Sequence, residues 1–261
     1  MLKTLKRLLL FSTILLCSFT VKSDDDGILK TVVIDAGHGG KDPGARGKIS
    51  REKDIVLDLA VALATKIKAE MPEVKVILTR NSDRFVELSD RSGIANRKKA
   101  DLFISIHCNA SPKSKAVHGT ETFAMGLHKT DENLEVAKRE NAVILQEKDY
   151  KEKYQGFNLN SPLAYIMMAN RQSAHLSSSL SFANRVERQF KKYANRSSRG
   201  VKQAGFLVLW QTNMPSVLIE AGFLSNEEEE EYLNTEEGQE EITEAIFRAF
   251  KQYKKDVEEN N

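Results

Sequence analysis

Short, mainly apolar runs alternate with amphipathic segments along most of the chain. The apolar runs predict buried strands at residues 31–34, 74–78, 102–106, 120–124, 205–210 and 216–219. Helical spacing predicts helices over 53–70, 89–99, 225–233 and 240–253, the third with Ser225 and Glu228 as its capping box. Strands alternating with helices predict an α/β fold: a single domain with a mixed, largely parallel twisted sheet flanked by helices.

The middle of the chain interrupts this alternation. Residues 131–149 are charged and favour a helix, whereas residues 150–160 favour a loop. Ser161 and Pro162 then mark the start of a long helix that extends to about Phe190, with the serine as N-cap and the proline at the first helical position. A simple connection between a strand and a helix is much shorter, so the pattern predicts a helical insertion at about 128–178.

The N-terminus has the layout of a secretory signal peptide. A basic opening precedes an almost wholly apolar stretch from Leu8 to Val21, and acidic residues follow Ser23. The apolar stretch is short for a membrane span. The expected organisation is a signal peptide at 1–23, a catalytic domain at 24–255 and a polar tail at 256–261, in the periplasm or cell envelope. An uncleaved anchor, or a lipoprotein anchored at Cys17, remains an alternative.

Charge and cysteine content narrow the class of protein. The chain of 261 residues carries a formal charge of +2, which becomes −2 when the four basic residues of 1–23 are removed. A charge near zero gives no reason to expect nucleic-acid binding. Only Cys108 would remain after cleavage, so the mature chain cannot form an internal disulfide. We expect a monomer that is stabilised by its hydrophobic core.

Four residues with metal-binding or acid–base side chains follow strands or begin a helix. His38 lies in a glycine-rich loop after the first strand, His107 and Glu220 end two later strands, and Glu52 begins the first long helix. Strand ends at one edge of a sheet can converge on one point. Two imidazoles and a carboxylate leave one position open on tetrahedral zinc, and a further carboxylate can transfer protons. The spacing alone leaves a structural role for each residue open.

Five segments, taken together, resemble the signature blocks of zinc-dependent N-acetylmuramoyl-L-alanine amidases. These blocks are DAGHGGKDPGARG (35–47), REKDIVLDLA (51–60), SIHCNA (105–110), RGVKQAGFLVL (199–209) and PSVLIEAGFLSN (215–226). The resemblance implies that His38, Glu52 and His107 bind Zn²⁺ and that Glu220 is the catalytic carboxylate. It also implies hydrolysis of the amide between N-acetylmuramic acid and L-alanine of peptidoglycan. The alternatives are a non-catalytic peptidoglycan-binding protein and a zinc carboxypeptidase acting within the stem peptide.

The insertion resembles a feature of division-associated members of that family. In those relatives a helical segment blocks the catalytic site until a partner displaces it, and a glutamate of the segment reaches the metal. The resemblance implies an activator protein for this chain and a role in cell-wall remodelling or daughter-cell separation, with Glu140 or Glu147 as the blocking residue. A surface helix with solvated charges is the alternative interpretation.

Overall fold

A computed structural model describes residues 27–169 and 174–259 of the chain. The six strands are β1 (Thr31–Ala36), β2 (Lys75–Leu78), β3 (Leu102–Asn109), β4 (Thr120–Met125), β5 (Ser198–Ala204) and β6 (Ser216–Phe223). They form one sheet in the order β2-β1-β3-β6-β4-β5. The four neighbouring strands β2, β1, β3 and β6 are parallel to one another. Strand β4 runs antiparallel to β6 and parallel to β5. The predicted mixed, largely parallel sheet is confirmed, while the predicted signal peptide at 1–23 lies outside the described residues.

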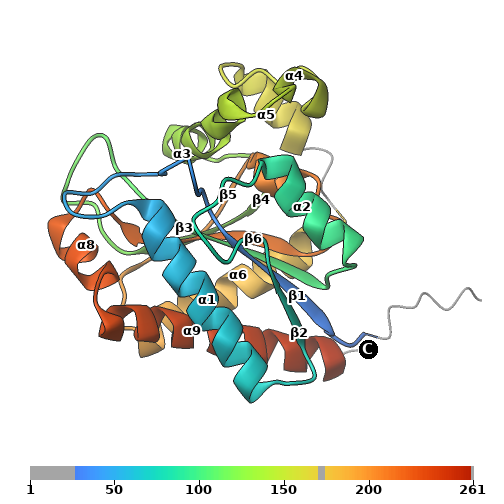
Figure 1. Cartoon of the computed structure of the whole chain (residues 1–261), viewed down its shortest axis with the longest axis vertical. Helices are drawn as coiled ribbons and strands as arrows, with labels where there is room; N and C mark the ends of the chain where they lie inside the picture. The colour runs from blue at the N-terminus through green and yellow to red at the C-terminus, as the bar shows by residue number, and fades with distance from the viewer. Residues whose placement is uncertain (1–26, 170–173, 260–261) are drawn as a thin grey trace, which may run out of the picture.

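Helices cover both faces of the sheet (Figure 1). They are α1 (Glu52–Glu70), α2 (Leu88–Arg97), α3 (Asp131–Asn141), η1 (Ala142–Gln146), α4 (Tyr150–Lys153), α5 (Pro162–Ala169), α6 (Leu176–Tyr193), α7 (Leu207–Trp210), α8 (Glu227–Leu233) and α9 (Glu236–Glu259). None of these described helices is both long and apolar enough to span a membrane.

Strand alternation divides the core into two layers. Val32, Ile34 and Ile104 point to one face, where they pack with the buried sides of α1, α6 and α9. Val33 and Phe103 point to the other face, toward α2, α3, α5 and α7. Because side chains two residues apart share a face, His107 lies on the second face with Phe103. Residues of α3 therefore lie on the same side of the sheet as this histidine.

The C-terminal part of the structure differs from the prediction in two places. The apolar run 205–210 was expected to be a strand, but Leu207–Trp210 forms the short helix α7 and the strand β5 precedes it. Continuous apolar runs suit a short buried helix as well as a strand, so periodicity does not separate them. The predicted cap of α8 is also wrong, because Asn226 accepts from the Glu229 backbone N–H, whereas Ser225 Oγ accepts from Ser111.

The insertion is helical, as predicted, but it is built from several short pieces. The expected long helix is described as two helices, α5 and α6, with a turn at residues 174–175 directly before α6, while residues 170–173 lie outside the described residues. The range expected to be a loop contains the one-turn helix α4. In Figure 1, α3, α4 and α5 gather at the top of the view, away from α1 and α9. Helix α9 continues to Glu259, through part of the range expected to be a tail.

Candidate metal centre

The four residues singled out from the sequence meet at one edge of the sheet. His38 lies two residues beyond β1, and Glu52 is the first residue of α1. His107 of β3 is paired with Glu220 of β6 in the parallel register. The carboxyl ends of parallel strands lie at the same edge, so strand order brings together residues that are far apart in sequence.

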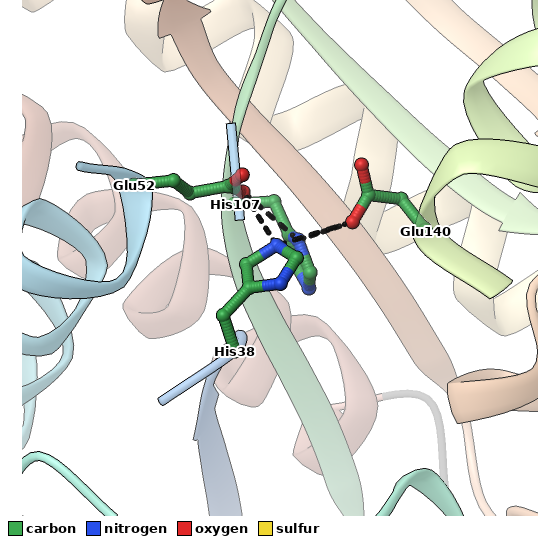
Figure 2. Close-up of side chains that lie close together, drawn as sticks. All are labelled: His38, Glu52, His107 and Glu140. Carbon is green, nitrogen blue, oxygen red and sulfur yellow. Dashed lines mark hydrogen bonds and ion pairs between the residues drawn. The ribbon is translucent and has the colours of Figure 1, made fainter. Parts of the chain in front are cut away.

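Two histidines and two glutamates form a compact buried cluster: His38, Glu52, His107 and Glu140 (Figure 2). Glu140 comes from α3 and joins three of the residues that were singled out from the sequence. One ligand atom of each residue lies within 4.8 Å of those of the other three. Glu52 Oε1 is 3.1 Å from both His38 Nε2 and His107 Nδ1. Glu140 Oε2 is 3.2 Å from His38 Nε2 and 3.1 Å from His107 Nδ1. Each carboxylate oxygen therefore lies between the same two imidazole nitrogens.

The glycine-rich loop determines how His38 is presented. The backbone of His38 is left-handed, with φ of 59°, an uncommon conformation for a residue with a side chain. Asp42 Oδ2 lies 2.7 Å from His38 Nδ1, which leaves Nε2 directed at the cluster. Gly44 packs so closely that a Cβ there would lie 2.5 Å from Glu52 Oε2. Glycine is therefore required where the loop passes the two side chains.

Backbone donors hold the carboxylate of Glu52. Ala45 N donates to Oε2 at 2.7 Å, and Cys108 N donates to Oε1 at 2.9 Å. Burial would raise the pKa of Glu52, but the nearby histidines His38 and His107 outweigh burial and lower it to about 2. Glu52 is therefore held ionised in the interior, as a metal-binding carboxylate must be.

The two histidines are strongly affected by the carboxylates around them. Burial would lower the pKa of His107, but Glu140 and Glu52 outweigh burial and raise it to about 9. The pKa of His38 is raised well above its usual value, since Glu52, Asp42 and Glu140 together outweigh burial. The surrounding carboxylates thus favour positive charge at the centre of the cluster.

Glu220 has different surroundings from the other two carboxylates. No described residue hydrogen-bonds either oxygen of this fully buried side chain. Burial, together with the negative charges of Glu140 and Glu52, raises its pKa well above the usual range. A buried carboxyl group without hydrogen-bond partners can hold and release a proton, which suits acid–base chemistry.

The cluster fits a zinc ion by the chemistry and spacing of its donors. Imidazole nitrogen and carboxylate oxygen are ordinary zinc ligands, and tetrahedral coordination at about 2.0–2.1 Å places ligand atoms about 3.3 Å apart. The distances of 3.1–3.2 Å between carboxylate oxygens and imidazole nitrogens agree with that spacing. His38 Nε2 and Glu140 Oε2 are buried and without a hydrogen-bond partner among the described residues. Both atoms are thus oriented toward one shared point.

The two glutamates of the insertion that were candidates for blocking the site have separate roles. Glu140 reaches the cluster, as described above. Glu147 instead accepts from Leu88 N at 2.8 Å and from the Tyr154 hydroxyl at 2.7 Å, so it ties the insertion to α2. Glu147 is therefore not part of the metal centre.

Two contributors were not selected from the sequence. Asp42 orients His38, and its place four residues after the histidine in the glycine-rich loop was the available signal. Arg139 lies next to Glu140, with Nη2 3.9 Å from Glu220 Oε1. Nothing in its local sequence indicated this position, because the contact joins α3 to β6.

Arg80 and Arg91 support the loop that carries His38. Arg80 Nη2 donates to Gly37 O and Lys53 O, both at 2.7 Å. Arg91 Nη2 donates to His38 O at 2.6 Å. Cys108 is fully buried and packs in the layer of α1 and α9. His118, His128 and His175 lie outside the cluster.

The fold and the cluster define a single-domain α/β protein with a candidate metal centre at the carboxyl edge of its parallel strands. Comparison with known families identifies the family. The profile of the N-acetylmuramoyl-L-alanine amidases matches residues 32–252. The chain therefore belongs to the N-acetylmuramoyl-L-alanine amidase family.

Curated relatives and solved structures agree with this assignment. The chain is 36% identical to amidase AmiC of Escherichia coli O6:H1 over 85% of its own length but only 52% of that protein. It is 32% identical to AmiA of Escherichia coli K12, covering 86% of this chain and 76% of AmiA. The catalytic domain of CwlV from Bacillus (Paenibacillus) polymyxa has a TM-score of 0.64 and 32% identity, covering 87% of this chain and 99% of the domain.

A further solved structure contains a second protein. The CwlD amidase from Clostridioides difficile, in complex with the GerS lipoprotein, has a TM-score of 0.63 and 28% identity. The similarity covers 86% of this chain and 98% of CwlD. The chain thus spans nearly all of these catalytic domains but about half of AmiC.

Proposed function

We propose that this protein hydrolyses the amide between N-acetylmuramic acid and L-alanine of peptidoglycan, using Zn²⁺ held by His38, Glu52 and His107, with Glu220 as the proton carrier. Family membership supports the reaction class. The observation that carries the proposal is the convergence of two imidazoles and Glu52 beside a buried carboxyl group without hydrogen-bond partners.

Each residue of the site has a separate task in this proposal. Zinc, when bound, would supply a Lewis acid that polarises the scissile carbonyl and acidifies a water molecule. Glu220 takes a proton from the attacking water and later gives it to the departing amine of L-alanine. Asp42 keeps His38 Nε2 directed at the cluster, and the backbone N–H groups of Ala45 and Cys108 fix Glu52. The chain thus contributes orientation and proton transfer.

Analysis of products from purified peptidoglycan tests this function. Cleavage by the zinc-supplemented protein should release intact stem peptides with a new L-alanine amino terminus. Release of single amino acids would instead indicate a carboxypeptidase. Binding without any release, even after the site is opened by substitution of Glu140, would indicate a non-catalytic wall-binding protein.

We further propose that the insertion inhibits the enzyme. Glu140 Oε2 lies between the two imidazole nitrogens, on the opposite side of the histidines from Glu52 (Figure 2), and would fill a coordination position that substrate or water requires. Arg139 lies over Glu220 at the same time. Helix α3 must therefore move before peptidoglycan can enter, which is consistent with control by a partner protein.

The partner and the compartment belong to this proposal as well. A solved relative, CwlD, forms a complex with a lipoprotein, and this precedent supports an activator protein for the present chain. Peptidoglycan lies outside the cytoplasm, which agrees with the signal-like layout of residues 1–23. Co-purification from envelope extracts, with N-terminal sequencing of the recovered chain, tests both points.

A further inference from the structure

Arg139 of the insertion occupies two hydrogen-bond acceptors at the end of β3 and also approaches Glu220. Arg139 Nη2 donates to Asn109 Oδ1 at 2.9 Å, and Nη1 donates to the Ala110 carbonyl oxygen at 2.9 Å. The same Nη2 atom is 3.9 Å from Glu220 Oε1. One nitrogen of the guanidinium is therefore close both to an amide acceptor and to the proposed proton carrier.

The side chain of Asn109 is held in one orientation. Its Nδ2 donates to Glu121 Oε1 at 2.6 Å, and an ionised carboxylate can only accept. Glu121 is itself nearly fully buried and ion-paired with Arg199, at 3.0 Å, and with Lys202. The asparagine amide cannot reverse without breaking this contact, so Oδ1 is fixed as an acceptor on the side of Glu220.

The strands place this acceptor on the catalytic face. Asn109 is two residues beyond His107 in β3 and so shares its face of the sheet. The register between β3 and β6 shifts after the His107–Glu220 pair, so that Asn109 pairs with Phe223. Such bulges re-aim side chains next to functional sites. Asn109 is 1% exposed, and its Oδ1 also accepts from Ala110 N at 2.7 Å. The second lone pair of Oδ1 accepts from Arg139, and a donor that enters the site could replace that contact.

We propose that Asn109 Oδ1 accepts the N–H of the scissile amide, and that the Ala110 carbonyl oxygen accepts the next backbone N–H of the stem peptide. Arg139 occupies both acceptors in the closed protein and stands where the leaving nitrogen lies in the open one. This inference rests on the proposed amidase function. It identifies a subsite for the peptide side of the substrate and gives the insertion a second contact besides Glu140.

The chemistry of the leaving group fits this arrangement. An amide N–H that donates to Asn109 Oδ1 takes the place of Arg139 Nη2. Because Arg139 Nη2 lies 3.9 Å from Glu220 Oε1, the amide nitrogen would also lie near Glu220. When the carbon–nitrogen bond breaks, the nitrogen takes the proton carried by Glu220 and keeps its own hydrogen on Asn109. No atom or electron is needed beyond water and substrate.

Binding measurements on a zinc-free, opened protein test the subsite without catalysis. The parent protein carries Arg139→Ala and Glu140→Ala, which remove the two contacts of the insertion, and a chelator is present. The ligands are a muramoyl-tripeptide and its analogue with L-lactate in place of L-alanine, whose scissile linkage is an ester without an N–H. Calorimetry compares both ligands on the parent and on the parent with Asn109→Ala.

We expect the parent to bind the amide about fivefold to tenfold more tightly than the ester, the effect of one neutral hydrogen bond. Asn109→Ala should remove that preference by weakening the amide alone. An Asn109→Ala protein that still prefers the amide by the same factor would overturn the inference. So would a parent that binds amide and ester equally.

A second variant covers the case in which Asn109→Ala does not fold. In Glu121→Gln the new side-chain amide can donate to Asn109, so the side-chain amide of Asn109 can reverse. This variant should therefore reduce the preference for the amide ligand over the ester ligand although Asn109 itself is unchanged.

Product analysis with zinc separates this inference from the proposed function. Preference for the amide without cleavage would refute the amidase proposal and leave the subsite standing, whereas cleavage without preference would refute the subsite.

Discussion

Buried carboxylates near the sheet edge have different chemistry because their partners differ. Glu52 is fixed by two backbone N–H groups, and His38 and His107 outweigh burial and lower its pKa to about 2. Glu220 receives no hydrogen bond from the described residues, and burial raises its pKa. One side chain type therefore supplies both a fixed anion and a proton carrier, and the surroundings decide which.

Replacing Glu220 with glutamine should separate catalysis from metal binding. The amide keeps the size of the side chain but cannot carry the proton, so we expect kcat to fall by about 10²–10⁴ while bound zinc is unchanged. His107→Ala removes a ligand and should lose zinc as well as activity. Turnover of peptidoglycan and metal content by atomic emission check both variants. Loss of zinc in Glu220→Gln would instead make this residue a ligand.

Replacing Asp35 should destabilise the protein rather than alter its chemistry directly. Asp35 is fully buried and accepts from Arg91, Thr79 and Ser105 at 2.6–2.8 Å. Asp35→Asn leaves the buried Arg91 guanidinium without its counter-charge, so the free energy of unfolding should fall by about 3–5 kcal/mol. Urea unfolding at pH 7 measures the change, and Asp54→Asn, at an exposed ion pair on α1, is the control.

The same residue predicts how stability changes in acid. Burial would raise the pKa of Asp35, but Arg91 and the hydroxyls of Thr79 and Ser105 outweigh burial and lower it. A pKa that is lower in the folded state contributes stability above the unfolded pKa, and this contribution is lost as pH falls through the folded pKa. Unfolding curves from pH 7 to pH 3 should therefore show a smaller loss in Asp35→Asn than in the unsubstituted protein. Equal losses would contradict the assignment.

Helix α3 acts as a unit, because adjacent residues on it reach different parts of the site. Glu140 enters the cluster and Arg139 covers Asn109 and Glu220, while the N-cap Thr130 accepts from Asn133 N and starts the helix. The first turn carries Asp131 and Glu132 and the last carries Lys138 and Arg139, as the helix dipole favours. The N-cap and the charges at both ends thus stabilise the helix locally.

Substitution of Glu140 should raise the basal activity of the isolated protein. Glu140→Ala removes the carboxylate from between the histidines, so we expect at least about a tenfold increase in peptidoglycan turnover. A tenfold increase corresponds to about 1.4 kcal/mol less free energy favouring the closed position of α3. Glu135→Ala on the exposed side of the same helix, where it pairs with Lys138, is the matched control and should have no effect. Unchanged turnover in Glu140→Ala would argue that α3 does not inhibit.

Local patterns predicted most elements, and they failed where a pattern fits two structures. The buried strands β1, β3 and β6 have apolar runs long enough to be unambiguous, whereas Leu207–Trp210 fits a helix or a strand equally. Strand β5 was missed because it is an edge strand with few apolar residues, and it carries the basic residues Arg199 and Lys202. The turn at residues 174–175 before α6 was missed because Ala174 and His175 are not strong helix breakers.

The residues of the candidate site that lie in family motifs at strand ends or at the start of a helix could be predicted from the sequence. His38, Glu52, His107 and Glu220 do converge, because each follows or begins a regular element at one edge. The choice between Glu140 and Glu147 required coordinates, since both are acidic residues of the insertion. Only the packing of α3 on the sheet shows that one reaches the histidines and the other caps α2.

The whole molecule is linked through the cluster, which joins parts of the chain that pack on opposite faces of the sheet. Glu52 belongs to α1 on one face, and Glu140 belongs to α3 on the other. The two histidines come from the edge between them. A metal ion held by all four residues would therefore connect both layers of the fold, so zinc binding and global stability should be coupled.

Zinc should raise the melting temperature of the protein, and Glu140 should contribute to that rise. A ligand that binds only the folded state stabilises it by about 2.7 kcal/mol at 100 times its Kd. Thermal unfolding with and without zinc measures the shift in the unsubstituted protein, in Glu140→Ala and in His107→Ala. We expect the largest shift with all four residues, a smaller one in Glu140→Ala, and none in His107→Ala. An equal shift in Glu140→Ala would show that α3 lies near the metal without binding it, and inhibition would then depend on Arg139 and steric exclusion rather than on coordination.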